Sequence, residues 1–273
     1  MRRTTLALSA LALISTLGAC STSSPDQASD TGGGDSQSRS SDSTRTFHKV
    51  SGLVSQTSNS MDSEQTVTME TEIEGGGTGL QGSMFSAMGG QTCQIDLGAN
   101  KMGCDGAMPM VMTEKAVYFK MPGSSQNGKP WTKTSLDSAD MSGNMGQLGS
   151  IRQYSDIETM LPEGSTIENT EREKLNGKQA TRYEIVTNLS EATAQSGSSA
   201  QKLYEFLREQ GIEQTRKTVW IGPNDLLMKV ESTNPSMEIA GQKIPEITTK
   251  VTYSDWGEPV DITVPPAEKV QSS

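Results

Sequence analysis

Hydrophobic and polar residues alternate over much of the chain, and this alternation predicts β-strands. In the first such stretch Val67, Met69, Thr71 and Ile73 share one face while acidic residues occupy the other, as in a half-buried strand. Similar stretches farther along the chain bring the prediction to about ten strands. Short turns separate many of them, and Asn176-Gly177 is a strong signal for a tight hairpin.

Three segments have helical spacing instead. Residues 46–58 carry apolar side chains three and four positions apart, and residues 151–157 do the same before Pro162. Residues 198–210 combine a capping box with one apolar face and end at a glycine. The sequence between the first and second of these helices also predicts a loop or short helix at 137–149, which is rich in Gly, Ser and Met.

The order of these elements predicts an α+β fold. Strands that follow one another through short turns form antiparallel sheets, and a few helices then pack on one face. Because strand twist accumulates, a sheet of so many strands is expected to curve strongly.

The first twenty residues have the organisation of an export signal. Arg2 and Arg3 precede an apolar run, and Leu17-Gly18-Ala19 leads directly into Cys20. The run of about twelve apolar residues is too short to span a bilayer, which takes roughly twenty. The last four residues resemble a bacterial lipobox, which implies that residues 1–19 are removed and that Cys20 is acylated. An ordinary secretory signal cleaved elsewhere is the alternative.

Residues 20–46 are predicted to form a disordered tether. They are mostly Ser, Thr, Gly and Asp and offer almost nothing to bury. A flexible segment of this length has an end-to-end distance of roughly 25 to 30 Å. Because several acyl chains anchor a protein stably, we expect an extracytoplasmic domain held on the outer face of the cell membrane.

The net charge of the chain is -10, which argues against a nucleic-acid partner. The leader contains two arginines and no acidic residue, so its removal lowers the net charge to -12. An acidic surface does not dock on anionic lipid head groups, and the acyl anchor is therefore the expected membrane contact.

Two cysteines remain after Cys20. A hairpin centred between Gly98 and Ala99 places Cys93 directly opposite Cys104, at a separation suited to a disulfide. An oxidising compartment favours the same pairing. A redox switch or a metal site is a weaker interpretation, because the spacing matches neither.

The sequence argues against an enzyme. His48 is the single histidine, so neither a histidine-activated nucleophile nor a pair of zinc-binding histidines can form. The chain has 33 Asp and Glu residues, and a catalytic carboxylate pair stays open on sequence alone. No phosphate-binding glycine loop precedes a helix, and neither a cofactor nor a metal is expected.

Four phrases resemble a known group of lipoproteins. They are Tyr118-Phe119-Lys120-Met121-Pro122, Gly128-Lys129-Pro130-Trp131, the stretch from Tyr253 to Ile262, and Pro265-Pro266. With the order of elements from Phe47 to Val270, they are similar to actinobacterial lipoproteins of the LppX/LprG type in the wider LolA-like group. The resemblance implies a half-barrel domain over residues 47–273, with helices on the concave face of the sheet and an apolar cavity between them. In such relatives the cavity holds acyl chains of lipids or glycolipids that cross the cell envelope.

The apolar faces of the predicted strands are the candidate lining of such a cavity, and ordinary core is the alternative. Methionine adapts its shape to varied apolar ligands and also fills irregular cores. The candidate residues are Val67, Met69, Met108, Met110, Met112, Val117, Phe119, Leu226, Met228 and Val230.

Two functions remain open. The first is a tethered carrier that shields acyl chains and releases them by movement of the helix at 198–210 or of the segment 137–149. The second is a cargo-free interaction or sensor module that docks on an envelope protein through a sheet edge or its acidic face.

Overall fold

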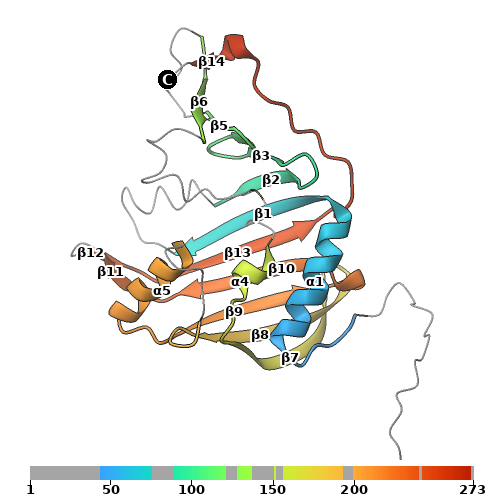
Figure 1. Ribbon diagram of the computed structural model, residues 1–273, viewed down its shortest axis with the longest axis vertical. Coiled ribbons are helices and arrows are strands. Elements are labelled where there is room, and N and C mark those ends of the chain that lie inside the picture. The colour runs from blue at the N-terminus through green and yellow to red at the C-terminus, as the bar shows by residue number, and fades with distance from the viewer. Residues whose placement is uncertain are drawn as a thin grey trace, which may run out of the picture. The chain divides into compact units, whose positions relative to one another are not determined.

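The computed structural model describes residues 44–75, 89–120, 128–136, 151, 156–192, 199–239 and 242–271 (Figure 1). The chain divides into two compact units, Met1–Ser38 and Arg39–Ser273, and all described residues belong to the second. Within these ranges no helix is both long enough and apolar enough to cross a lipid bilayer.

Twelve strands form one open sheet in the order β14-β6-β5-β4-β3-β2-β1-β13-β10-β9-β8-β7. Neighbours pair antiparallel, except that β14 runs parallel to β6. A separate hairpin pairs β11 with β12. The strands are β1 (Thr66–Gly75), β2 (Gln91–Asp96), β3 (Lys101–Asp105), β4 (Met110–Thr113), β5 (Ala116–Phe119), β6 (Trp131–Ser135), β7 (Ser165–Leu175), β8 (Lys178–Asn188), β9 (Gln214–Ile221), β10 (Leu227–Asn234), β11 (Met237–Ile239), β12 (Gln242–Ile244), β13 (Ile247–Ser254) and β14 (Val270–Gln271).

Three α-helices accompany the sheet in the described residues: α1 (Val50–Glu64), α4 (Ile157–Met160) and α5 (Ser199–Glu209). Helices α1 and α4 touch each other and cover the same face of the sheet (Figure 1). The predicted fold class is confirmed: the protein is an α+β half-barrel, a curved antiparallel sheet with helices on its concave face.

Most predicted elements lie within a few residues of their observed positions. The hairpin at Asn176-Gly177 is present, with both residues at positive φ, as a tight two-residue turn requires. The prediction was wrong at Met108, which lies before β4 and not in a strand. The segment 137–149 lies outside the described residues, as does most of the predicted helix at 151–157.

Helix α1 begins and ends later than residues 46–58. Residues Thr44 to Phe47 have no regular secondary structure and instead form hydrogen bonds to β8. At the other end the helix continues to Glu64 and stops where Gln65 adopts a left-handed conformation. Three side chains of α1, those of Leu53, Thr57 and Met61, are buried.

A hydrogen-bonded network holds the start of the domain to β8. The Tyr183 hydroxyl accepts a bond from the backbone N–H of Phe47 (3.0 Å) and donates to the carbonyl of Arg45 (3.1 Å). The Thr181 hydroxyl bonds to that of Thr44, and Arg172 donates to the Thr44 carbonyl. The folded domain therefore includes Thr44 to Thr46, which the sequence analysis placed in the tether.

The C-terminal segment returns across the outer face of the sheet, the face away from α1. Ile262 lies against Gly103 of β3, where an added Cβ would approach Ile262 Cγ2 to 3.2 Å. The segment then reaches β6, where Val270 and Gln271 form β14. The close approach of Ile262 explains why a glycine stands at position 103.

Tyr183→Phe tests the network at the start of the domain. The substitution keeps the ring but leaves the Phe47 N–H without its buried acceptor, so we expect a loss of about 1 to 3 kcal/mol in the free energy of unfolding. Urea denaturation measures this change. Tyr118→Phe on β5, outside the network, is the matched control and should change stability by much less; equal effects of the two substitutions would contradict the assignment.

Candidate functional site

The face of the sheet that α1 covers, called the inner face below, carries two adjacent rows of apolar residues. Each row consists of one residue from each of the strands β1 to β5, paired across the sheet. On every strand the residue of the second row is two positions away from that of the first. Because side chains alternate along a strand, both rows point toward the helices. The first row is Met69, Cys93, Cys104, Met110 and Phe119, and the second is Val67, Ile95, Met102, Met112 and Val117.

Six of the ten predicted lining residues therefore lie together. Four of them, Val67, Met69, Met112 and Val117, are buried in the main hydrophobic core. Met110 and Phe119, at the β4–β5 end, are half-buried and pack against that core. The inner face is thus a packed surface, and its assignment as a lipid cavity stays a prediction.

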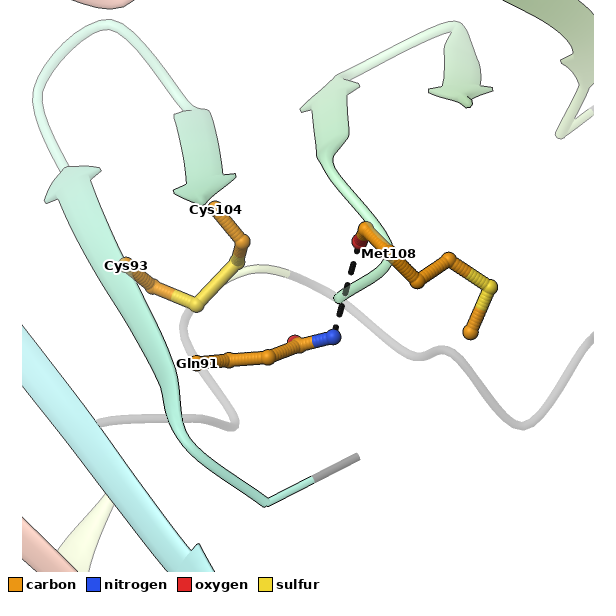
Figure 2. The surroundings of a disulfide bond; sticks show 4 residues. All are labelled: Gln91, Cys93, Cys104 and Met108. Carbon is orange, nitrogen blue, oxygen red and sulfur yellow. Dashed lines mark hydrogen bonds between the residues drawn. A yellow bond between two sulfur atoms is a disulfide. The ribbon is translucent and has the colours of Figure 1, made fainter. Parts of the chain in front are cut away.

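The other four predicted lining residues are more scattered. Val230 of β10 is buried in the same core, and Leu226 packs against it. Met228 occupies a bulge in β10, has no partner in β9 and lies against Gly222. The structure does not bring Met228 or Met108 into the two rows; the Met108 carbonyl instead accepts a bond from Gln91 Nε2 beside the disulfide (Figure 2).

The predicted disulfide is present in the structure. Cys93 and Cys104 are directly opposed on β2 and β3, with a Cα–Cα distance of 4.0 Å (Figure 2). Both side chains are buried, and their neighbours across the sheet are Met69 and Met110. The bond therefore crosslinks the first apolar row at its centre.

An open cleft of about 790 Å³ lies beside the inner face, between α1, α4 and the start of β7. Its apolar lining includes Val50, Val54, Leu161 and Ile167, all of which belong to or pack against the main core. The apolar residues of the cleft and those of the two rows therefore belong to one packed cluster. Its polar lining is His48, Lys49, Ser51, Ser55, Glu158, Glu163, Ser165 and Thr166.

Thr57 introduces a polar atom into the layer between α1 and the sheet. Its side chain is fully buried, and in the described part of the chain its Oγ1 is the buried side-chain polar atom that lacks a hydrogen-bond partner. An unsatisfied buried hydroxyl costs about 1 to 3 kcal/mol. Val54, one helical turn earlier, lines the cleft, so Thr57 is one helical turn from a residue of the cleft wall.

Tyr253 of β13 extends the first row beyond β1. It pairs with Met69, stacks on Trp256 with ring centroids 6.2 Å apart, and is almost fully buried. Burial strongly raises the pKa of its phenol, which therefore stays neutral. Among the described residues no group of three His, Cys, Asp or Glu side chains is arranged to hold a metal ion.

Sequence reasoning missed the cleft, because its walls come from three separate elements. One signal was available in α1: Val50 and Val54 are four residues apart and offset from the buried stripe of Leu53, Thr57 and Met61. An apolar surface wider than the stripe that the sheet covers indicates a second contact or an opening.

Comparison with known proteins finds similar structures but no matching sequence family. No protein-family model and no curated protein match the chain. The crystal structure of the lipoprotein LppX from Mycobacterium tuberculosis is 14% identical, with 78% of this chain and 98% of that chain covered and a TM-score of 0.43. LprF from Mycobacterium bovis is 13% identical over 79% and 96%, with a TM-score of 0.44.

A third similar structure is a domain described as an outer membrane lipoprotein-sorting protein from Vibrio parahaemolyticus. It is 11% identical over 72% of this chain and 88% of that chain, with a TM-score of 0.21. The matched structures agree with the predicted resemblance to LppX-type and LolA-like proteins. No residue role is transferred at this level of likeness.

Removal of the disulfide should destabilise the domain. The crosslink closes a loop between residues 11 positions apart, for which the chain-entropy model gives about 2 to 3 kcal/mol. We expect the double variant Cys93→Ala, Cys104→Ala to unfold at correspondingly lower urea concentration.

Reduction of the natural protein should reproduce this loss, whereas the double variant should not respond to reductant. An unchanged urea midpoint in the double variant would contradict a structural role for the bond.

Proposed function

We propose that the protein is a membrane-anchored, extracytoplasmic lipoprotein that binds the acyl chains of a lipid or glycolipid and helps to carry it across the cell envelope. The observation that carries this proposal is the cleft of about 790 Å³ whose apolar lining is continuous with the methionine-rich inner face. No catalytic role is proposed.

The size and lining of the cleft suit a lipid. Ligand pockets commonly measure roughly 300 to 1,000 Å³ and combine apolar walls with a few polar groups. Here Val50, Val54, Leu161 and Ile167 supply the apolar walls, and charged and hydroxyl side chains surround them. Acyl chains would contact the former and water the latter.

The interior would open by separation of α1 from the inner face. Methionine side chains at 69, 102 and 112 have three flexible bonds and reshape more easily than branched residues. An acyl chain that enters from the cleft would replace part of the contact between α1 and these rows. The unsatisfied Thr57 hydroxyl would then gain access to a polar group of the ligand.

The anchor in this proposal is Cys20, which lies outside the described residues. Its acylation would keep the domain at the membrane surface, and the tether would let the cleft reach a neighbouring layer. The mature chain would remain extracytoplasmic.

A cargo-free interaction or sensor module is the second candidate. It is favoured by the tight packing of Val67, Met112 and Val117, which are at most 1% exposed. On this alternative the inner face is permanent core, and an envelope protein would bind the long, charged edge strand β7.

Lipid content distinguishes the two candidates. We would express the full chain with Cys20→Ser in an actinobacterial host, so that the exported protein carries no acyl group, and purify it without detergent. Native mass spectrometry with lipid extraction should show a stoichiometric lipid. The bare protein mass would reject the carrier and leave the interaction module.

Val54→Arg should lower that lipid occupancy severalfold by placing a long charged side chain in the cleft wall. Asn59→Arg is the matched control, because it adds the same charge to an exposed position of α1 away from the cleft. Equal occupancy in the two variants would contradict the role of the cleft.

Thr57→Val should separate stability from binding. The substitution removes an unsatisfied buried hydroxyl, so the lipid-free protein should be unchanged or more stable by up to about 1 kcal/mol in urea denaturation. Its lipid occupancy should fall. Thr66→Val, which removes a hydroxyl bonded to the Glu258 carbonyl, should be destabilising; a destabilised Thr57→Val variant with full occupancy would contradict the proposal.

A further inference from the structure

Lys217 is the one charged residue on a large part of the inner face. On β9 it lies between Thr215 and Val219 with the same orientation, and its partners across the sheet are Ile185 and Ser232. The inward residues of the described strands β1 to β6, β8, β10 and β13 are all uncharged, as their register shows. A charge at this position therefore requires an explanation.

The contacts of Lys217 do not neutralise it. Its Nζ donates a hydrogen bond to the carbonyl of Met160, the last residue of α4. In contrast to Arg182, Arg216, Lys229 and Lys250, it forms no ion pair with a carboxylate of the described part of the chain. One carbonyl of a four-residue helix offsets little of the cost of burying an ammonium group.

Burial lowers the pKa of Lys217 to about 8. The amine is therefore still mainly protonated at neutral pH, although the described residues provide no counter-charge. An anion beside it would restore the missing interaction and raise this pKa again.

Residues with hydroxyl groups neighbour Lys217 on the same face. Ser232 is directly opposite Lys217, Thr249 follows on β13, and Thr215 lies two residues along β9. All three are half-buried, so the described elements leave them partly open. A protonated amine with hydroxyl donors on its own and neighbouring strands is the chemistry that binds phosphate or carboxylate oxygens.

The position of this polar group fits one end of an amphiphile. Ile167 in the cleft wall, Ile185 and Lys217 stand side by side on β7, β8 and β9, so Lys217 is about 10 Å from the wall. In the other direction the same row continues through Ser232 of β10 and Thr249 of β13 to Ile73 of β1. Met69, where the first apolar row begins, lies about 13 Å from Ile73 along β1.

We propose that the cargo is an anionic amphiphile whose phosphate or carboxylate group binds the Lys217 amine and the neighbouring hydroxyls, with its acyl chains over the methionine-rich rows. This inference rests on the proposed carrier function and specifies the head group that the carrier selects. Binding is by charge and hydrogen bonds and involves no covalent step.

The test measures head-group preference. The full chain with Cys20→Ser is stripped of lipid and incubated with vesicles of equal parts phosphatidylglycerol and phosphatidylcholine, and the lipid bound to the re-isolated protein is identified by native mass spectrometry. We expect about a tenfold excess of the anionic lipid, which corresponds to about 1.4 kcal/mol. A parallel incubation with palmitic acid tests the carboxylate, and inorganic phosphate tests a free anion.

Lys217→Gln should abolish the preference, and Lys217→Arg should retain most of it. Lys250→Gln is the matched control, because it removes the same charge from the outer face of the sheet, where Lys250 pairs with Glu74. If Lys217→Gln does not fold, the double variant Ser232→Ala, Thr249→Val supplies the second measurement and should reduce the preference severalfold.

The outcomes separate the two proposals. Uptake of neither lipid nor fatty acid would overturn the carrier function and this inference together. Uptake without head-group preference, or a preference that folded Lys217→Gln retains, would overturn this inference alone. Displacement of the bound lipid by millimolar inorganic phosphate would overturn the amphiphile assignment in favour of a free-anion site.

Discussion

The register of β1 to β5 is the constraint on which the inner face depends. Side chains alternate with a period of two, so a slip of one residue in any of these strands would exchange its apolar residues for polar ones. Cys93 and Cys104 lie directly opposite each other in the observed register, and their disulfide bond then holds β2 against β3. Two unbroken apolar rows follow across five strands, and with them a surface large enough to receive a helix or an acyl chain.

The helices α1 and α4, which lie over that surface, are less fully packed than the surface itself. Helix α1 buries a narrow stripe and leaves Val50 and Val54 in the cleft wall, and its Thr57 hydroxyl has no partner. Helix α4 contributes a carbonyl to Lys217 but no counter-charge. These unsatisfied groups all lie between the helices and the inner face. Their cost is tolerable in a sheet fixed by strand pairing, and it favours any ligand that can satisfy them.

Local patterns predicted much of this architecture. The alternation of Val67, Met69 and Ile73, the turn at Asn176-Gly177 and the cysteine spacing each depend on neighbours in sequence, and each was confirmed. The beginning of α1 was misplaced because the residues before it are held by a hydrogen bond to Tyr183, 136 residues away from Phe47. The cleft was missed for the same reason, since α1, α4 and β7 meet only in the folded chain. The inward direction of Lys217 is readable from Thr215, Val219 and Ile221, but the absence of a carboxylate opposite is not.

The pairing of β14 with β6 affects how copies of the protein can associate through their sheet edges. An open sheet has two edges, and unpaired edge groups recruit strands from other molecules. One edge is occupied by Val270 and Gln271, and the other, β7, carries Glu168, Glu171, Arg172, Glu173 and Lys174. If the proposed Cys20 anchor holds copies in one membrane plane, they would meet at high local concentration. Occupied and charged edges would let them pass one another as monomers and not polymerise edge to edge.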